Sequence, residues 1–200
     1  MPMSLADHLI YALLWLGFAV SHSVLAGADV RRGIGRLVGR AHRLVYNVLA
    51  LLLLLAVLAT GRWLAGDAPP LVLPVPLLWV MNVAVIAGLL LGWMALRSYQ
   101  LGAFVGTAQL RGADEDAAPL AVSGMHRWRR HPLYSAVLLV VWGMARSELD
   151  VATACWVTLY LLIGSRIEEH RLIRRYGEAY RRYRSTTPAF MPRWPRATSG

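Results

Sequence analysis

Residues 44–61 read LVYNVLALLLLLAVLATG, a stretch without a charged side chain. About 20 helical residues are needed to cross the roughly 30 Å hydrocarbon core of a membrane. Two further uncharged runs of similar length lie on either side, at residues 9–28 and 77–96. These runs are continuous rather than alternating, which argues against the strands of a membrane barrel. The sequence therefore predicts membrane-spanning α-helices.

Two shorter apolar runs follow, at residues 133–145 and 151–165, and a small polar turn separates them. They predict a tight helical hairpin. The expected fold class is all-α: an integral membrane helical bundle of about five transmembrane helices with a C-terminal amphipathic cytoplasmic helix. We expect residues 1–110 to form a scaffold of three spans, and residues 111–200 to hold the catalytic part.

The composition agrees with a lipid environment. Hydrophobic residues make up 57% of the chain and charged residues only 16%, which is more apolar than a soluble domain. The single cysteine, Cys155, excludes a disulfide within the chain. The six histidines show no metal-ligand spacing, so no metal site is expected.

All 21 basic residues are arginine, and the formal net charge is +10. The arginines gather at residues 31–43, at residues 111–130 and from residue 166 onward, whereas the intervening loops carry Arg62 and Arg146. The positive-inside rule places the N-terminus outside and the C-terminus in the cytoplasm. Because the charge follows membrane topology and no recognition motif accompanies it, we expect membrane lipids and no nucleic acid as partners.

The first motif is GMHRWRRHPLY, residues 124–134, directly before the fourth apolar run. Pro132 suits the first position of a helix, where its missing N–H costs nothing, and it holds His131 in an extended conformation just outside. Arg130 and His131 are therefore expected at the cytoplasmic mouth of the bundle.

The second motif is RIEEHRLIRRYGEAYRRY, residues 166–183, at the end of the fifth run. If this segment is one helix, a single face carries Glu169, Ile173, Tyr176, Tyr180 and Tyr183. The arginines then lie largely on the other faces, as in a helix that rests on an anionic membrane surface. Gly177 is a weak point that can bend this helix.

The two motifs carry the groups that S-adenosylmethionine needs. Its carboxylate requires a guanidinium, from Arg130 or Arg166, and its amino group and ribose require a carboxylate, from Glu168 or Glu169. Its adenine requires an apolar or aromatic slot, for which the candidates are Trp128, Tyr134, Tyr180 and Tyr183. A protonated acceptor needs a general base; His131 is preferred over His126 and Glu169 because imidazole titrates nearest neutral pH.

Other interpretations of these residues stay open. The arginines can serve only as positive-inside anchors, the tyrosines as interface aromatics, and His131 as a capping residue. The pair Glu168–Glu169 is harder to explain in this way, because carboxylates at the end of a membrane helix are costly unless they are paired or functional.

At these two motifs the sequence resembles the isoprenylcysteine carboxyl methyltransferase and phospholipid methyltransferase superfamily, in particular its bacterial branch of methanethiol S-methyltransferases and NnrU-like proteins. The pattern is Arg-His-Pro-x-Tyr at residues 130–134, Glu-Glu-x-x-Leu at residues 168–172, and Tyr-Gly-x-x-Tyr-x-x-Tyr at residues 176–183, followed by a Pro-containing end. The resemblance covers residues 120–192. One departure is Ala136, where the family usually has glycine.

The resemblance implies an S-adenosylmethionine-dependent methyltransferase in a bacterial cytoplasmic membrane, acting on sulfur, oxygen or nitrogen of a small thiol or lipophilic acceptor. It implicates Arg130, His131, Tyr134, Glu168 and Glu169, and the expected catalytic residues are His131, Glu169 and Arg166. The expected cofactor-binding set is Gly124, His126, Arg130, His131, Pro132, Tyr134, Glu168, Glu169, Tyr180 and Tyr183. The alternatives are an NADPH-dependent enzyme of the sterol-reductase type and a non-catalytic NnrU-like membrane protein.

Overall fold

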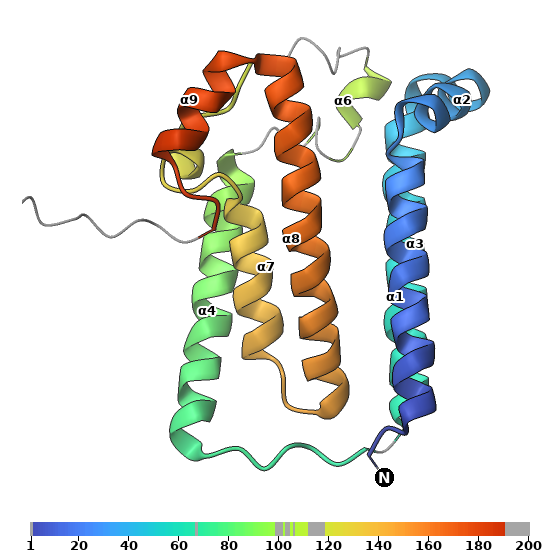
Figure 1. Ribbon diagram of the computed structural model, residues 1–200, viewed down its shortest axis with the longest axis vertical. Helices are drawn as coiled ribbons and strands as arrows, with labels where there is room; N and C mark the ends of the chain where they lie inside the picture. The colour runs from blue at the N-terminus through green and yellow to red at the C-terminus, as the bar shows by residue number, and fades with distance from the viewer. Residues whose placement is uncertain are drawn as a thin grey trace, which may run out of the picture. The chain divides into compact units, whose positions relative to one another are not determined.

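The computed structural model describes residues 2–66, 68–98, 102, 105, 107–111 and 119–190 (Figure 1). These residues form helices and turns, with no strand among them, which confirms the all-α fold class. The acidic residues 114–116, and residues 191 and 192 of the Pro-containing end, lie outside this set. The chain divides into two compact units. The first comprises residues 1–75, 100–118 and 145–156, and the second comprises residues 76–99, 119–144 and 157–200.

The first unit contains three main helices and several short elements. Its elements are α1 (Leu5–Leu25), α2 (Ala28–Val38), the 3-10 turn η1 (Gly39–Ala41), α3 (His42–Ala65), α6 (Thr107–Leu110) and the start of α8. A capping box begins α1: the Asp7 amide donates to Ser4 Oγ at 3.2 Å, and the Ser4 amide donates to the Asp7 carboxylate at 2.8 Å. Helices α1 and α3 run side by side (Figure 1).

Aromatic side chains fill the contact between α1 and α3. Tyr11, Trp15 and Phe18 are buried and meet edge to face, with centroids 6.2 and 5.8 Å apart. Tyr11 lies against Gly61 of α3, where an added Cβ would come within 2.9 Å of the ring carbon Cζ. The absence of a side chain at Gly61 therefore lets the aromatic row pack on the backbone of α3.

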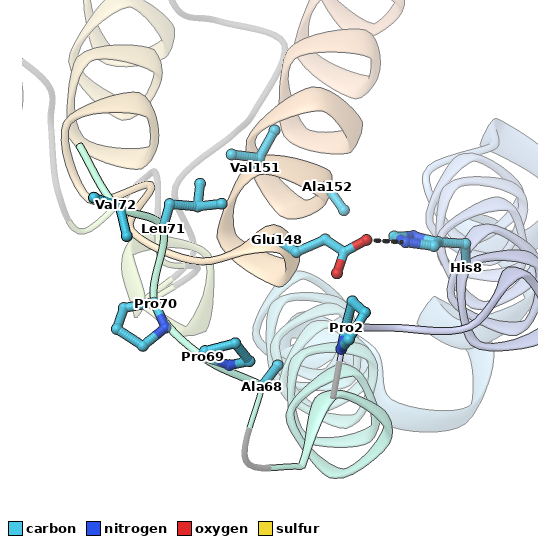
Figure 2. A pocket seen from close by; sticks show the side chains of 10 residues that line it. All are labelled: Pro2, His8, Ala68, Pro69, Pro70, Leu71, Val72, Glu148, Val151 and Ala152. Atoms are coloured by element: carbon cyan, nitrogen blue, oxygen red, sulfur yellow. Dashed lines mark hydrogen bonds and ion pairs between the residues drawn. The ribbon is translucent and has the colours of Figure 1, made fainter. Parts of the chain in front are cut away.

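A cavity of about 720 Å³ opens in the first unit (Figure 2). Its walls are mainly apolar and come from residues 68–72 and from the start of α8. His8 Nε2 lies 2.8 Å from Glu148 Oε1 at this cavity, and the Met3 amide donates to Glu148 Oε2 at 2.9 Å. Both oxygens of Glu148 therefore hold the beginning of the chain.

The second unit contains most of α4 (Val75–Ser98), the 3-10 turn η2 (Gly124–Arg127), α7 (Pro132–Gly143), α8 (Glu148–Tyr176) from residue 157, and α9 (Glu178–Thr186). Small residues bring α4 and α7 together. A Cβ on Gly88 would lie 2.9 Å from the Ala136 carbonyl oxygen, and one on Gly143 would lie 2.7 Å from the Met81 carbonyl oxygen. This close approach of backbones is typical of helices that associate in lipid.

Four stretches among the described residues are long and apolar enough to cross a membrane: Leu5–Leu25, Arg32–Ala65, Val75–Arg97 and Glu148–Tyr176. The fourth predicted run is α7, which has only 12 residues and is shorter than a full crossing. The hairpin of α7 and α8 agrees with the prediction, and Trp142 Nε1 joins its two helices by donating to Thr158 Oγ1 at 3.0 Å. The orientation of the chain across the membrane stays a prediction.

The second motif does not form one helix. Helix α8 ends at Tyr176, Gly177 adopts a left-handed conformation with φ of 55°, and α9 begins at Glu178. Such a backbone conformation is cheap only for glycine. The weak point expected at Gly177 is therefore a complete break, and the single face expected for Glu169 through Tyr183 is divided between two helices.

Candidate functional site

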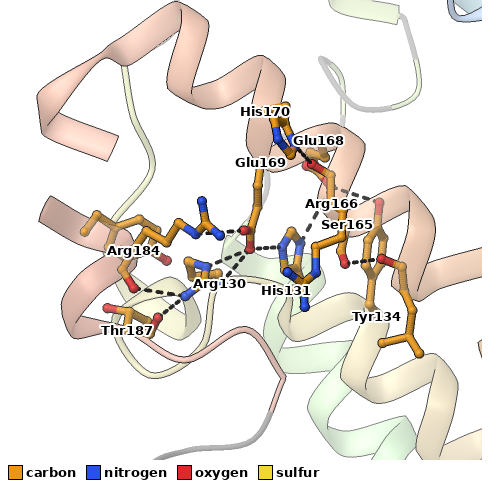
Figure 3. Close-up of polar contacts among 12 residues, drawn as sticks. Arg130, His131, Tyr134, Ser165, Arg166, Glu168, Glu169, His170, Arg184 and Thr187 are labelled. Carbon is orange, nitrogen blue, oxygen red and sulfur yellow. Dashed lines mark hydrogen bonds and ion pairs between the residues drawn. The ribbon is translucent and has the colours of Figure 1, made fainter. Parts of the chain in front are cut away.

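The candidate site is centred on Glu169, in the last third of α8. Only 3% of this residue is exposed, so its charge requires partners. Glu169 Oε1 accepts from Arg130 Nε at 2.9 Å and Nη2 at 2.7 Å, and it lies 3.1 Å from His131 Nε2 (Figure 3). Oε2 pairs with Arg184 Nε of α9 at 3.2 Å. The predicted meeting of Arg130 and Glu169 is therefore present in the structure.

Arg130 also holds the segment that follows α9. Its Nη1 donates to the carbonyl oxygen of Arg184 at 3.1 Å and to that of Thr187. We refer to Arg130, His131, Glu169, Arg184 and Thr187 as the Glu169 cluster. All the contacts of Arg130 named here are with protein groups, so its side chain acts as a brace between α8 and the end of α9.

Residues 187–190 form a strap over the first motif. The Arg130 amide donates to the Pro188 carbonyl and the His131 amide to the Ala189 carbonyl, each at 2.9 Å. Ser135 Oγ donates to the Phe190 carbonyl at 2.9 Å. Because Pro132 starts α7 and leaves His131 outside the helix, both amides are free for this pairing.

His131 lies between two carboxylates. Its Nε2 is 3.1 Å from Glu169 Oε1, and its Nδ1 is 3.6 Å from Glu168 Oε2. The ring stacks on Tyr134 with centroids 5.2 Å apart and planes at 8°, and it also stacks on Phe190 at 5.6 Å. A carboxylate only accepts hydrogen bonds, so the short contact with Glu169 requires a proton on Nε2.

The two neighbouring carboxylates differ in exposure. The side chain of Glu168 is 47% exposed, whereas that of Glu169 is 4% exposed. Glu168 Oε2 accepts from the hydroxyl of Tyr134 at 3.0 Å. Both oxygens of Glu169 are therefore occupied by protein groups, whereas Glu168 faces outward beside His131 and Tyr134 (Figure 3).

The two tyrosines of α9 in the predicted set have different roles. Tyr183 donates to the carbonyl of His126 at 2.6 Å. Tyr180 is 1% exposed, and its hydroxyl has no hydrogen-bond partner among the described residues. Burial raises the pKa of each phenol to about 12, with the nearby Glu169 charge adding to the effect. Both hydroxyls are therefore protonated at neutral pH.

His126 belongs to the support of this region. It is buried in η2, and its Nδ1 donates to the Arg130 carbonyl at 3.2 Å. Burial lowers the pKa of His126 below its ordinary value. At neutral pH it is therefore an uncharged donor that fixes the backbone of Arg130.

The remaining predicted residues lie at the margins. Pro132 is the first residue of α7, as expected. Gly124 begins η2 with φ of 59° and lines a separate hollow with Arg97 and Arg127. Arg166 is exposed on α8, and within the described part of the chain its guanidinium makes no hydrogen bond or ion pair with the Glu169 cluster.

Sequence reasoning missed Arg184, Thr187 and Ser135. Thr187 and the strap contribute main-chain carbonyls, which have no sequence signature. The Pro-containing end at residues 188–192 was the only signal that could have pointed to the strap. At the departure from the family pattern, Ala136 is buried, and a Cβ on Gly92 would lie 3.5 Å from its methyl group, an ordinary contact. The extra methyl therefore fits between α4 and α7.

Comparison with known proteins gives curated relatives from several bacteria. The methanethiol S-methyltransferase 1 of Bradyrhizobium diazoefficiens is 26% identical over 97% of this chain and 70% of its own length. The methanethiol S-methyltransferase of Mycobacterium tuberculosis is 28% identical over 92% of this chain and 77% of its own length. That of Pseudomonas deceptionensis is 33% identical over 64 residues, which span only 24% of its length.

No solved structure matches the chain. One family model matches residues 28–187, and its description is "Protein of unknown function (DUF1295)". With the curated relatives, this match confirms the resemblance to the bacterial branch of the isoprenylcysteine carboxyl methyltransferase group. Four-fifths of the chain lies within the match, and the chain belongs to the DUF1295 family.

Proposed function

We propose that this protein is a membrane-embedded methyltransferase that uses S-adenosylmethionine as methyl donor and a small thiol as acceptor. The names of its curated relatives support methyl transfer to methanethiol-like thiols. The site residues support it independently, because they place unlike charges and a basic imidazole at one end of α8.

The observation that carries the proposal is the asymmetry of Glu168 and Glu169. Glu169 is buried and paired with Arg130, Arg184 and His131, so its role is to hold these side chains in place. Glu168 is half-exposed, and among the described residues its contacts with Tyr134 and His131 both involve Oε2. A carboxylate held in this way can take the amino group of the donor and favours its cationic sulfonium by electrostatic attraction.

The chemistry of the surrounding residues fits this donor. Arg129 has a buried Nε without a hydrogen-bond partner among the described residues, and Tyr180 has an unpartnered hydroxyl. Arg129 or Arg166 would hold the carboxylate of the donor, Glu168 its amino group, and Tyr134 its adenine. When bound, the donor supplies an electrophilic methyl group. Arg130 and Glu169 position the other residues.

His131 serves as the general base for the thiol acceptor. With Nε2–H donated to Glu169, Nδ1 is the nitrogen that can accept a proton. Glu169 stabilises the imidazolium that forms, and Glu168 lies 3.6 Å from Nδ1. The ring stacks on Tyr134 and Phe190, which hold its plane. Apart from removal of the thiol proton, most of the rate acceleration comes from holding the thiol sulfur close to the methyl carbon of the donor.

Equilibrium binding of labelled S-adenosylmethionine to the purified full-length protein tests the proposal, with labelled NADPH as the competing ligand. We expect binding of S-adenosylmethionine and not NADPH. Glu168→Gln is expected to weaken donor binding about 10- to 100-fold, as loss of a charged hydrogen bond does. The matched control is Glu178→Gln, which removes the same charge from an exposed position of α9.

Normal donor affinity in Glu168→Gln, or equal losses in the two variants, contradicts the proposed site. Tight binding of NADPH instead identifies the reductase-type alternative. An acceptor assay with methanethiol, a lipid amine and a carboxylate then tests the thiol assignment. We expect methyl transfer to the thiol, with His131→Ala lowering turnover far more than donor affinity.

A further inference from the structure

A second hollow lies in the second unit, where α4 ends. Its volume is about 500 Å³, and its lining is Met94, Arg97, Gly124, Met125, Arg127 and Trp128. Neither Glu168 nor His131 lines it, so the proposed methyl transfer does not account for it. We refer to it as the Arg97–Arg127 hollow.

Among the described residues, the two arginines of this hollow have aromatic neighbours and form no ion pair with a carboxylate. The Arg97 guanidinium lies 5.3 Å from the centroid of Trp93, and the Arg127 guanidinium lies 5.2 Å from that of Trp128. Within the described residues, neither forms an ion pair with a carboxylate. Two guanidinium groups that line one hollow repel each other, and an anion between them removes that repulsion.

The position of the hollow along α4 indicates which anion reaches it. The stretch Val75–Arg97 has 23 residues, which correspond to about 34 Å of helix, close to the thickness of the hydrocarbon core. Arg97 at its end therefore lies at the level of the lipid headgroups. Trp93 and Trp128 are both exposed, as interface aromatics are.

From this geometry we propose that the Arg97–Arg127 hollow binds the phosphate of an anionic phospholipid such as phosphatidylglycerol. The planar guanidinium groups match the oxygens of a phosphodiester. Met94, Met125 and Trp128 supply apolar surface for the glycerol and the first carbons of the acyl chains. The hollow thus holds one lipid beside the first motif.

Native mass spectrometry of the full-length protein with phosphatidylglycerol or phosphatidylcholine tests this site. We expect preferential retention of phosphatidylglycerol. Arg97→Gln and Arg127→Gln should each weaken its binding about fivefold, the value for one arginine at an anionic lipid surface, and the double variant should lose the preference. The matched control is Arg174→Gln, because Arg174 is exposed on α8 and outside the hollow. It should bind phosphatidylglycerol like the unaltered protein.

Several results would overturn the proposal. Equal losses in Arg174→Gln and Arg127→Gln would mean that only overall charge matters. Equal retention of phosphatidylcholine would exclude recognition of an anionic lipid. Displacement of the lipid by millimolar inorganic phosphate or by S-adenosylmethionine would assign the hollow to a soluble anion or to the methyl donor. If the Gln variants unfold on heating at a lower temperature, Arg97→Lys and Arg127→Lys replace them; both should keep part of the preference.

Discussion

Arg130 donates two hydrogen bonds to a single oxygen of Glu169, through Nε at 2.9 Å and Nη2 at 2.7 Å, while its third nitrogen holds the carbonyls of Arg184 and Thr187. The guanidinium thus neutralises a buried carboxylate and fixes a main-chain segment at the same time. Charge alone would explain the first role but not the second, which needs the planar fork of arginine.

Replacement of Arg130 by alanine should destabilise the protein as well as disturb the site. The side chains of Arg130 and Glu169 are only 11% and 4% exposed, and removal of one partner from a buried ion pair costs about 3–5 kcal/mol. Thermal unfolding in detergent measures this cost. Arg130→Met combined with Glu169→Met removes both charges and should lose less stability than Arg130→Ala alone. An unchanged midpoint in Arg130→Ala would show that the pair is not formed.

Gly177→Ala should destabilise the junction of α8 and α9. The backbone conformation of this residue, with φ of 55° and ψ of −128°, costs about 1–3 kcal/mol for a residue with a side chain. Gly164→Ala is the control, because Gly164 lies within α8 and an added Cβ there meets nothing within 4 Å. Unfolding midpoints should fall for Gly177→Ala and stay equal or rise for Gly164→Ala. Equal midpoints for the two variants would argue against a break at Gly177.

Two glycines one turn apart on α4 should respond differently to alanine. A Cβ on Gly88 would lie 2.9 Å from a backbone carbonyl oxygen that cannot move aside easily, whereas one on Gly92 would make an ordinary contact at 3.5 Å. Overpacking of this kind costs about 1–3 kcal/mol. Gly88→Ala should therefore lower the unfolding midpoint, and Gly92→Ala should leave it nearly unchanged. The reverse order would contradict the contact between α4 and α7.

His126 should make stability depend on pH in the mildly acidic range. Its pKa in the folded state is lowered from the ordinary value of 6.5, mainly by burial. The unfolded chain therefore binds a proton more readily, so the stability due to neutral His126 is present above pH 6.5 and is lost as the pH falls toward the lowered pKa. His126→Asn keeps a donor for the Arg130 carbonyl without this titration. Its unfolding midpoint should fall less than that of the unaltered protein between pH 7.5 and 5.5.

The membrane helices and the central contact of the site could be predicted from the sequence. Continuous apolar runs have few alternative structures, and Arg130, His131, Glu168 and Glu169 are costly near a membrane helix unless they meet. The break at Gly177 was only half-predicted, because glycine is also tolerated inside helices. Whether its backbone turns left-handed depends on tertiary contacts of α9, such as that of Arg184 with Glu169.

The partners that complete the site could not be predicted. Thr187, Pro188 and Ala189 act through carbonyl oxygens, and every residue carries one. The sequence also could not tell that Glu169 is buried and Glu168 is exposed. Adjacent positions of a helix point about 100° apart, and either one can face inward. In the structure Arg130 and His131 contact Glu169, and this contact determines which of the two carboxylates is buried.

The strap has a consequence for synthesis. Arg130 and His131 emerge from the ribosome nearly 60 residues before the carbonyls to which their amides donate, and Glu169 follows them before Arg184 does. Until residue 189 has left the exit tunnel, the amides of Arg130 and His131 lack their carbonyl partners, and Oε2 of Glu169 gains its partner Arg184 only shortly before. Ordering of this site therefore cannot be complete until the strap is available to pair with the first motif.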